Sequence, residues 1–193
     1  MLLVKLYFTP TLLLLLLALS SARSVPVTSR GPGAGCVFHA RSLLGNITAA
    51  LTQSDLFNGI NCTTQSVELY METNTTAVCA PRGSMCTGFT VSEFSEESCM
   101  TSIGKDLLHY YNILSDQPDP DSKLGETVLF SLRELMQNCF GWTRPTDLTS
   151  KQAAATRDFD GRLTLCKVLR GFQVRSVTIN RALGYINSGE HTQ

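Results

Sequence analysis

Several common signatures are missing from this chain of 193 residues. Its 16 basic and 16 acidic residues balance, so it lacks the positive surplus of a protein that binds nucleic acid or an anionic membrane surface. It has no uninterrupted apolar run of the roughly 20 residues needed to cross a bilayer. It contains no His-Glu-x-x-His, Gly-x-Ser-x-Gly or Gly-x-x-x-x-Gly-Lys motif. We therefore expect no nucleic acid, no membrane insertion, no cofactor or metal and no enzymatic activity.

Histidine is scarce as well, with His39, His109 and His191 the only three. None has a neighbouring pattern typical of a catalytic base or a metal ligand. We expect the first two at the surface or boundary of helices, and His191 in a tail that frays.

Acidic residues are absent from one long stretch near the C-terminus, since no Asp or Glu occurs between Asp160 and Glu190. Five basic residues fall in the same stretch: Arg162, Lys167, Arg170, Arg175 and Arg181. An ordinary amphipathic helix solvates its outer face with both charges and forms i,i+4 ion pairs. Bases without acids therefore point to a partner for this helix.

The N-terminus has the features of a secretory signal. Lys5 precedes an apolar run from Leu12 to Leu19, and Ser20-Ser21-Ala22 fits the small-x-small cleavage pattern. We expect residues 1–22 to be removed, although an uncleaved membrane anchor is the alternative. Residues 23–193 would then form one secreted, extracellular domain.

Seven cysteines follow this signal, at positions 36, 62, 79, 86, 99, 139 and 166. In a secreted chain they predict disulfides rather than a zinc site. Because seven is odd, one cysteine is unpaired or bonds to another chain. Three Asn-x-Thr sequons, at Asn46, Asn61 and Asn74, predict glycosylation, with Asn74 in the most loop-like context.

Apolar residues recur at helical spacing in four segments, about 38–56, 95–114, 123–140 and 159–187. In the last segment the stripe alternates steps of four and three over roughly six turns. No run alternates with the period of two that is typical of a strand. The chain is therefore predicted to be all-α.

The lengths of the connections predict the topology. The connection 116–122 is short and contains two prolines, so the second and third helices are antiparallel neighbours. The connections 58–92 and 142–158 can each span a helix of about 27 Å. Two long crossovers and one short turn predict a long-chain four-helix bundle, up-up-down-down.

This topology places the cysteines at the two poles of the bundle. Cys62 and Cys166 share one pole, while Cys79 and Cys99 could join the first crossover to the second helix. Cys36 lies at the other pole with both Cys86 and Cys139. Geometry leaves Cys36–Cys86 and Cys36–Cys139 as equal alternatives.

A second stripe lies opposite the core stripe of the fourth helix, at about 100° per residue. It comprises Arg170, Val174, Val177, Thr178, Arg181 and Tyr185. Valine, tyrosine and unpaired arginine are typical of a protein–protein interface, and a buried arginine would require an acidic pocket in the partner. In one alternative a crossover loop covers this stripe. In another the stripe binds glycosaminoglycan or a membrane surface, which the interleaved apolar residues disfavour.

Nearly the whole chain after residue 22 resembles the interleukin-12 alpha subunit family of long-chain four-helix cytokines. The resemblance rests on Leu165-Cys166, Phe172, Arg175, "VTINR" (177–181), Tyr185 and Asn187, on "ELMQ" (134–137) and on "CMTSIGKDLLHYY" (99–111). It implies a subunit that pairs with a beta subunit built like a soluble cytokine receptor. By the same resemblance, Arg181 enters an acidic pocket of that partner, and Phe159 contacts the signalling receptor.

The resemblance also implies the disulfides Cys36–Cys86, Cys62–Cys166 and Cys79–Cys99. Cys139 has no counterpart, so it would be unpaired or intermolecular. The cysteine by which the family bonds to the beta subunit is missing from the shorter first crossover, which leaves the covalent linkage open.

The expected function is therefore that of a secreted alpha subunit of a heterodimeric cytokine. By resemblance, it would signal through interleukin-12 receptor chains to T and NK lymphocytes and promote interferon-gamma and type 1 immunity. The alternatives are the alpha subunit of a sister heterodimer, such as interleukin-23, and a single-chain helical cytokine.

Overall fold

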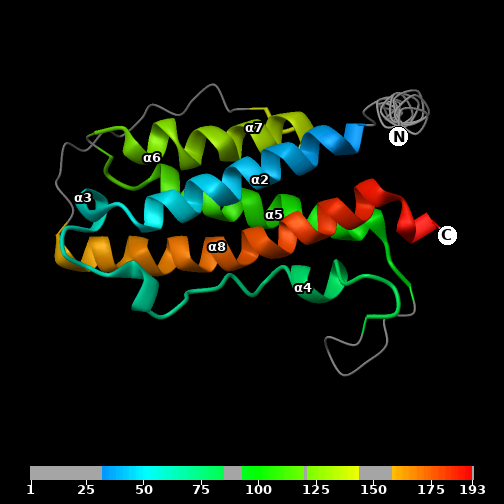
Figure 1. The fold of residues 1–193 in the computed structure, drawn as a ribbon, viewed down its shortest axis with the longest axis horizontal. Helices are drawn as coiled ribbons and strands as arrows, with labels where there is room; N and C mark the ends of the chain where they lie inside the picture. The colour runs from blue at the N-terminus through cyan, green and yellow to red at the C-terminus, as the bar shows by residue number, and fades with distance from the viewer. Residues whose placement is uncertain (1–31, 85–92, 120, 144–157, 193) are drawn as a thin grey trace, which may run out of the picture. The chain divides into compact units, whose positions relative to one another are not determined.

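The computed structural model describes residues 32–84, 93–119, 121–143 and 158–192. Within them every regular element is helical, so the all-α prediction is confirmed (Figure 1). Among the described helices, none has the length and apolar character to span a membrane. The expected signal segment, residues 1–22, lies outside the described residues.

The elements are α2 (Pro32–Leu51), α3 (Ser54–Phe57), η1 (Cys62–Thr64), α4 (Thr75–Val78), α5 (Glu96–Ser115), α6 (Lys123–Glu126), α7 (Val128–Phe140), α8 (Phe159–Ser188) and η2 (Glu190–Thr192).

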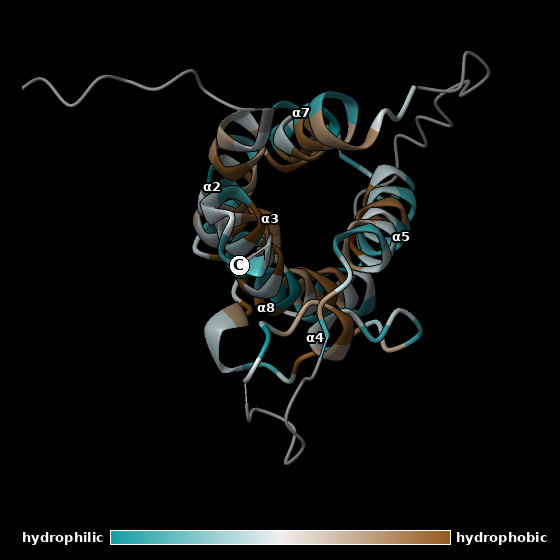
Figure 2. Cartoon of the chain, turned by 90° about the vertical axis from the view of Figure 1, so that its right-hand side faces the viewer, coloured by the Kyte–Doolittle hydropathy of each residue, from teal (hydrophilic) through white to brown (hydrophobic). Residues whose placement is uncertain are grey.

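The four long helices α2, α5, α7 and α8 form a bundle. α2 and α5 run in one direction, and α7 and α8 return in the other (Figure 1). Seen along the bundle, α2 and α5 lie on opposite sides, each packed between α7 and α8, and the apolar surfaces turn inward (Figure 2). The predicted up-up-down-down four-helix bundle is therefore confirmed.

Capping residues set the boundaries of the second and fourth long helices. The side chain of Ser95 accepts a hydrogen bond from the Ser98 backbone N–H at 3.2 Å, and Asp158 accepts one from Gly161 at 2.8 Å. Each side chain satisfies a backbone donor that the first turn of a helix leaves unpaired. Gly189 ends α8 in the left-handed conformation, with φ of 71°.

The first and third predicted helices differ from the observed ones. The segment predicted as 38–56 forms a helix from Pro32, whose fixed φ suits a first helical position. Gln53 is extended, with φ of −75° and ψ of 111°, and this separates α3 from α2. The segment predicted as 123–140 is divided at Thr127, where φ of −115° and ψ of −83° leave the helical region.

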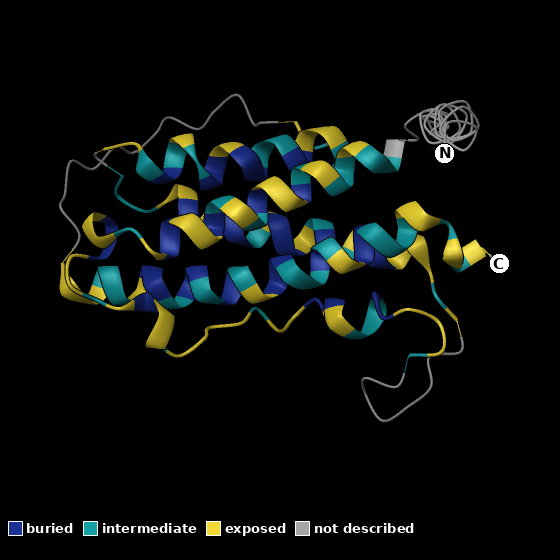
Figure 3. Ribbon diagram, in the orientation of Figure 1, coloured by how far each residue is buried: buried dark blue, intermediate teal, exposed yellow. Residues whose placement is uncertain are grey.

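The hydrophobic core lies between the four long helices (Figure 3). Tyr110 of α5 and Phe172 of α8 stack near its centre, with ring centroids 4.3 Å apart. Burying a large apolar side chain stabilises the fold by roughly 1.5–3 kcal/mol. Fully buried members include Leu43, Ile47, Ile103, Leu107, Leu132, Leu135, Leu165 and Phe172.

Three disulfides join the described elements. Cys62–Cys166 joins η1 to α8, and Cys79–Cys99 joins the segment after α4 to α5, both as expected. The third is Cys36–Cys139, between the first turns of α2 and the last turn of α7, with a Cα–Cα distance of 5.7 Å.

The expected Cys36–Cys86 disulfide is therefore wrong, and Cys139 is not a spare thiol. The start of α2 and the end of α7 meet at one pole, which satisfies the short span that a disulfide requires. Geometry had allowed this pairing, and the family resemblance favoured the other because it offered no counterpart of Cys139. The seventh cysteine, Cys86, lies outside the described residues.

Candidate functional site

The six residues predicted as an outer stripe on the fourth helix lie together on α8, away from the bundle core. We call Arg170, Val174, Val177, Thr178, Arg181 and Tyr185 the α8 face. Val174 is 43% exposed, and Arg181 is exposed as well. The other four residues are partly exposed. The helix thus presents valine and arginine side chains to the surroundings.

α2 packs along one flank of the α8 face. The amide of Asn180 donates to the backbone carbonyl of Ala40 at 2.9 Å, and the amide of Gln173 donates to the hydroxyl of Thr48 at 3.1 Å. These hydrogen bonds occupy the polar residues on this side of α8. They involve no residue of the α8 face.

The first crossover packs along the opposite flank. The backbone N–H of Glu68 donates to the carbonyl of Lys167 at 3.3 Å. A Cβ added at Gly171 would lie 1.7 Å from the carbonyl oxygen of Glu68, far inside van der Waals contact. Glycine at this position lets the extended crossover run directly against the helix.

A buried ion pair fixes the crossover to both α5 and α8. The Nε atom of Arg175 lies 3.4 Å from the Oδ2 atom of Asp106, a separation that makes an ion pair rather than an aligned hydrogen bond. The Asp106 carboxylate also accepts hydrogen bonds from the hydroxyls of Thr73 and Thr75. Arg175 donates to the carbonyl of Tyr70. Both charged side chains are buried, at 0% and 5% exposure, so each depends on the other.

These contacts decide what the first crossover covers. Its described part is held beside α8, at Gly171 and Arg175, while Val174 and Arg181 stay exposed. In the described residues, the alternative in which this crossover covers the outer stripe therefore does not apply to Val174 or Arg181. The second crossover, 144–157, lies outside them.

The three histidines occupy unrelated positions. His109 stacks on Tyr70 with ring centroids 3.6 Å apart, and burial lowers its pKa below the ordinary value against the opposing effect of Asp106 and nearby glutamates. His39 lies beside Phe38, while His191 pairs with Glu96. Among the described residues, no three potential ligands gather as a metal would require.

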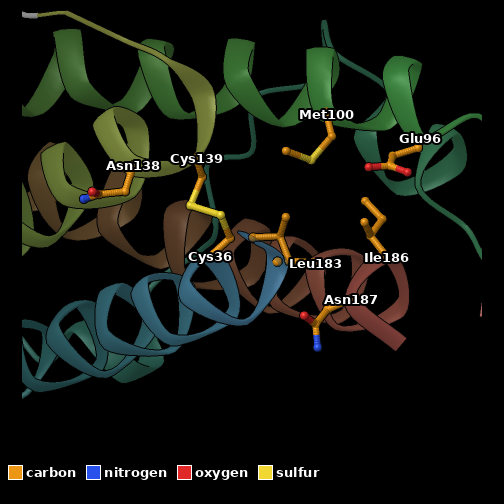
Figure 4. Close-up of a pocket in the computed structure, with 9 residues that line it drawn as sticks. Cys36, Glu96, Met100, Asn138, Cys139, Leu183, Ile186 and Asn187 are labelled. Atoms are coloured by element: carbon orange, nitrogen blue, oxygen red, sulfur yellow. A yellow bond between two sulfur atoms is a disulfide. The ribbon is translucent and has the colours of Figure 1, made fainter. Parts of the chain in front are cut away.

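A cavity of about 400 Å³ opens at the pole where α2 and α5 begin and α7 and α8 end (Figure 4). The Cys36–Cys139 disulfide forms part of its wall, together with Met100 and Leu183 (Figure 4). Glu96 is the one titratable side chain among the described residues that line it. The cavity includes none of the residues of the α8 face.

Phe159, the predicted receptor contact, lies far from the Arg181 end of the α8 face. It is the first residue of α8 and is 59% exposed. At about 1.5 Å per residue, some 33 Å of helix separates it from Arg181. The two residues can therefore meet different partners.

The three sequons differ in accessibility. The Nδ2 atom of Asn46 donates to the carbonyl of Thr127 at 3.4 Å, and the residue is partly buried within α2. Asn61 and Asn74 are exposed beside short helices. The structure thus favours these two as glycosylation sites over Asn46.

We expect Asn46→Gln to leave the glycan mass of the secreted chain unchanged, because the Asn46 amide is partly buried and donates to the Thr127 carbonyl. Asn74→Gln should remove one glycan and is the matched control. Intact mass before and after enzymatic removal of N-linked glycans checks both. A glycan on Asn46 would contradict the packing of α2 on Thr127.

Known proteins match this chain along most of its length. The family model described as the interleukin-12 alpha subunit matches residues 67–189, more than half of the chain. The chain belongs to the interleukin-12 alpha subunit family. Proteins named interleukin-12 subunit alpha from Capra hircus and Equus caballus are each 28% identical to it, over 88% of this chain and 90% of theirs. The Sigmodon hispidus protein is 28% identical over 90% of this chain and 93% of its own.

The family match runs from the first crossover to the end of α8 and thus includes the buried ion pair and the α8 face. Members of this family are cytokine subunits. Arg175 was one of the residues that carried the family resemblance, but its ion pair with Asp106 was not predicted from the sequence. The available signal was a lone carboxylate at position 106, next to the apolar stripe of Ile103, Leu107 and Tyr110.

Proposed function

We propose that this chain is the secreted alpha subunit of a heterodimeric cytokine, and that the α8 face binds the beta subunit. The observation that carries the proposal is Arg181, exposed on a helix that has no Asp or Glu from residue 161 to 189. An arginine that becomes buried in an interface needs a carboxylate. The partner must supply it, so the beta subunit presents an acidic pocket.

The neighbours of Arg181 support a protein partner rather than a polyanion. Val174 and Val177 gain from burial, whereas sulfates and phosphates would gain nothing from them. The planar guanidinium of Arg181 suits bidentate pairing with a carboxylate. Binding to glycosaminoglycan would weaken steeply as salt rises, and binding in a desolvated protein pocket would persist.

The assembled pair would engage a helical-cytokine receptor, with Phe159 as a contact of this subunit. Its exposed ring at the start of α8 is remote from the beta-subunit surface, so both contacts can form at once. By family resemblance, the target cells are T and NK lymphocytes, and the response is interferon-gamma production and type 1 immunity.

Arg181→Ala is expected to weaken assembly with the interleukin-12 beta subunit of the same species by about 2 kcal/mol or more, roughly 30-fold, as for a desolvated anchor. Co-secretion, native co-purification and surface plasmon resonance measure the effect. Lys105→Ala, an exposed base on α5, is the matched control and should change nothing. Equal affinity of the Arg181 and Lys105 variants would refute the assigned role.

A non-reducing gel of the same complex tests a covalent link. The three disulfides use six of the seven cysteines, so Cys86 is the remaining candidate. A band at the mass of the heterodimer that disappears in Cys86→Ser would identify the linkage. Separate subunits on the gel would show a non-covalent pair.

Two alternative functions predict different results for co-secretion with the beta subunit. The alpha subunit of a sister heterodimer, such as interleukin-23, would form the same complex with the beta subunit but signal through a different receptor pair. A single-chain helical cytokine would be secreted efficiently alone and would ignore the beta subunit.

A further inference from the structure

The chain folds back on itself after α8. Gly189 reverses its direction, and the turn η2 is closed by a hydrogen bond from the Thr192 backbone N–H to the carbonyl of Gly189 at 3.2 Å. This turn carries His191 toward the start of α5. The family match ends at residue 189, so the family relation does not predict what the turn does.

His191 connects three separate parts of the chain. Its Nε2 atom lies 3.1 Å from the Oε2 atom of Glu96 at the start of α5. Its ring lies 5.6 Å from that of Phe94, and its carbonyl accepts a hydrogen bond from Arg82 at 3.4 Å. The imidazole is 12% exposed although His191 is the third residue from the end of the sequence. The tail predicted to fray is thus packed in place.

The same contacts enclose Tyr185 of the α8 face. The ring of Phe94 meets it edge-on, with centroids 5.1 Å apart and planes at 85°. The ring of His191 lies 6.0 Å away. Phe94 precedes α5 and His191 follows α8, so two segments far apart in the sequence contact the Tyr185 ring.

We infer that η2 and Phe94 position Tyr185 for the beta subunit, next to Arg181. This inference rests on the proposed function of the α8 face. Tyr185 and Arg181 are four residues apart and therefore neighbours on one side of the helix. A tyrosine held in one orientation before binding loses less conformational entropy on association than a free one. His191 is thus a positioning residue that acts through Tyr185.

The partner chemistry follows from this arrangement. Beside the acidic pocket for Arg181, the beta subunit presents an apolar surface for the tyrosine ring, with a hydrogen-bond acceptor at its edge for the hydroxyl. The aromatic ring and the guanidinium together would form the centre of the interface.

A double-mutant cycle on the affinity for the interleukin-12 beta subunit tests the inference. His191→Ala should weaken binding about three- to tenfold in the wild-type background, as expected for one aromatic contact. In a Tyr185→Ala background it should have no further effect. Thr192→Ala, in the same turn but exposed, should bind as the wild type does. Additive effects of His191→Ala and Tyr185→Ala would overturn the inference.

A second variant separates the ring contact from the polar contact with Glu96. His191→Phe keeps an aromatic ring against Phe94 and Tyr185 and loses the pairing with Glu96. It should retain affinity within about twofold of the wild type, since the ring contact alone orients Tyr185. An affinity as low as that of His191→Ala would show that the ring contact alone does not orient Tyr185.

Arg181→Ala in the same assay separates a failure of the positioning role of His191 from a failure of the proposed function. If it weakens the complex and His191→Ala does not, the positioning role is overturned and the proposed function stands. If the wild-type chain forms no complex, the proposed function is overturned together with any docking role for Tyr185. The ring resonances of Tyr185 in His191→Ala then report whether η2 orders that side chain, independently of a partner.

Discussion

Asp106→Ala is expected to destabilise the chain by about 3–5 kcal/mol, the usual effect of removing one member of a buried ion pair. The substitution leaves the guanidinium of Arg175 buried, at 5% exposure, without its counter-charge. It also removes the acceptor of two threonine hydroxyls. Because the typical total stability of a domain is about 5–15 kcal/mol, this single change removes a large fraction of it.

The measurement is the denaturant midpoint of the purified, oxidised chain. Lys105→Ala, at the adjacent exposed position, is the matched control and should shift it little. The double variant Asp106→Leu with Arg175→Met should recover much of the loss, since apolar residues of similar volume replace a buried pair with little penalty. A loss below about 1 kcal/mol for Asp106→Ala would show that water reaches Arg175.

Loss of the Cys36–Cys139 disulfide is expected to lower the free energy of unfolding by about 2–5 kcal/mol. The bond closes a loop with a sequence separation of 103 residues, and its removal restores much of the conformational freedom of the unfolded chain. Cys139→Ser and Cys36→Ser should have equal effects. The double variant should lose no more than either one alone, because both remove the same bond.

Cys86 supplies the decisive control for the disulfide. The comparison is made in a Cys86→Ser background, so that no other thiol can take the place of Cys139. Cys86→Ser alone should leave the unfolding midpoint unchanged. A large loss on Cys86→Ser, with none on Cys139→Ser, would restore the Cys36–Cys86 pairing that the family resemblance implied.

Periodicity predicted the bundle well because its apolar stripes are long. The four stripes and the unequal connections were sufficient for the topology, since a short turn forces antiparallel neighbours and a long crossover does not. The boundaries were harder. Gln53 and Thr127 interrupt helices through backbone angles that neither residue type signals, and Pro32 begins a helix that its glycine-rich context disguises.

The α8 face was predictable because its signal is the absence of Asp and Glu along one helix. Recognising that absence requires no knowledge of the rest of the fold. The Asp106–Arg175 pair was not, because its members lie 69 positions apart and their approach depends on the crossover. The role of Gly171 was equally unpredictable, since a glycine in a helix has many explanations. Only the structure shows the backbone of Glu68 packed against it. Pairing of cysteines at one pole depends on distances that sequence does not contain.

The sequence separations of the three disulfides have a consequence for biosynthesis. Cys79 and Cys99 are 20 residues apart and can join as soon as both have left the ribosome, whereas Cys36 and Cys62 must wait for partners 103 and 104 residues later. At about 5–20 residues per second, that delay is roughly 5–20 seconds. During it, Cys86 is translated between Cys79 and Cys99 and competes with them as a thiol. The nascent subunit thus needs thiol protection or reshuffling before its bundle closes.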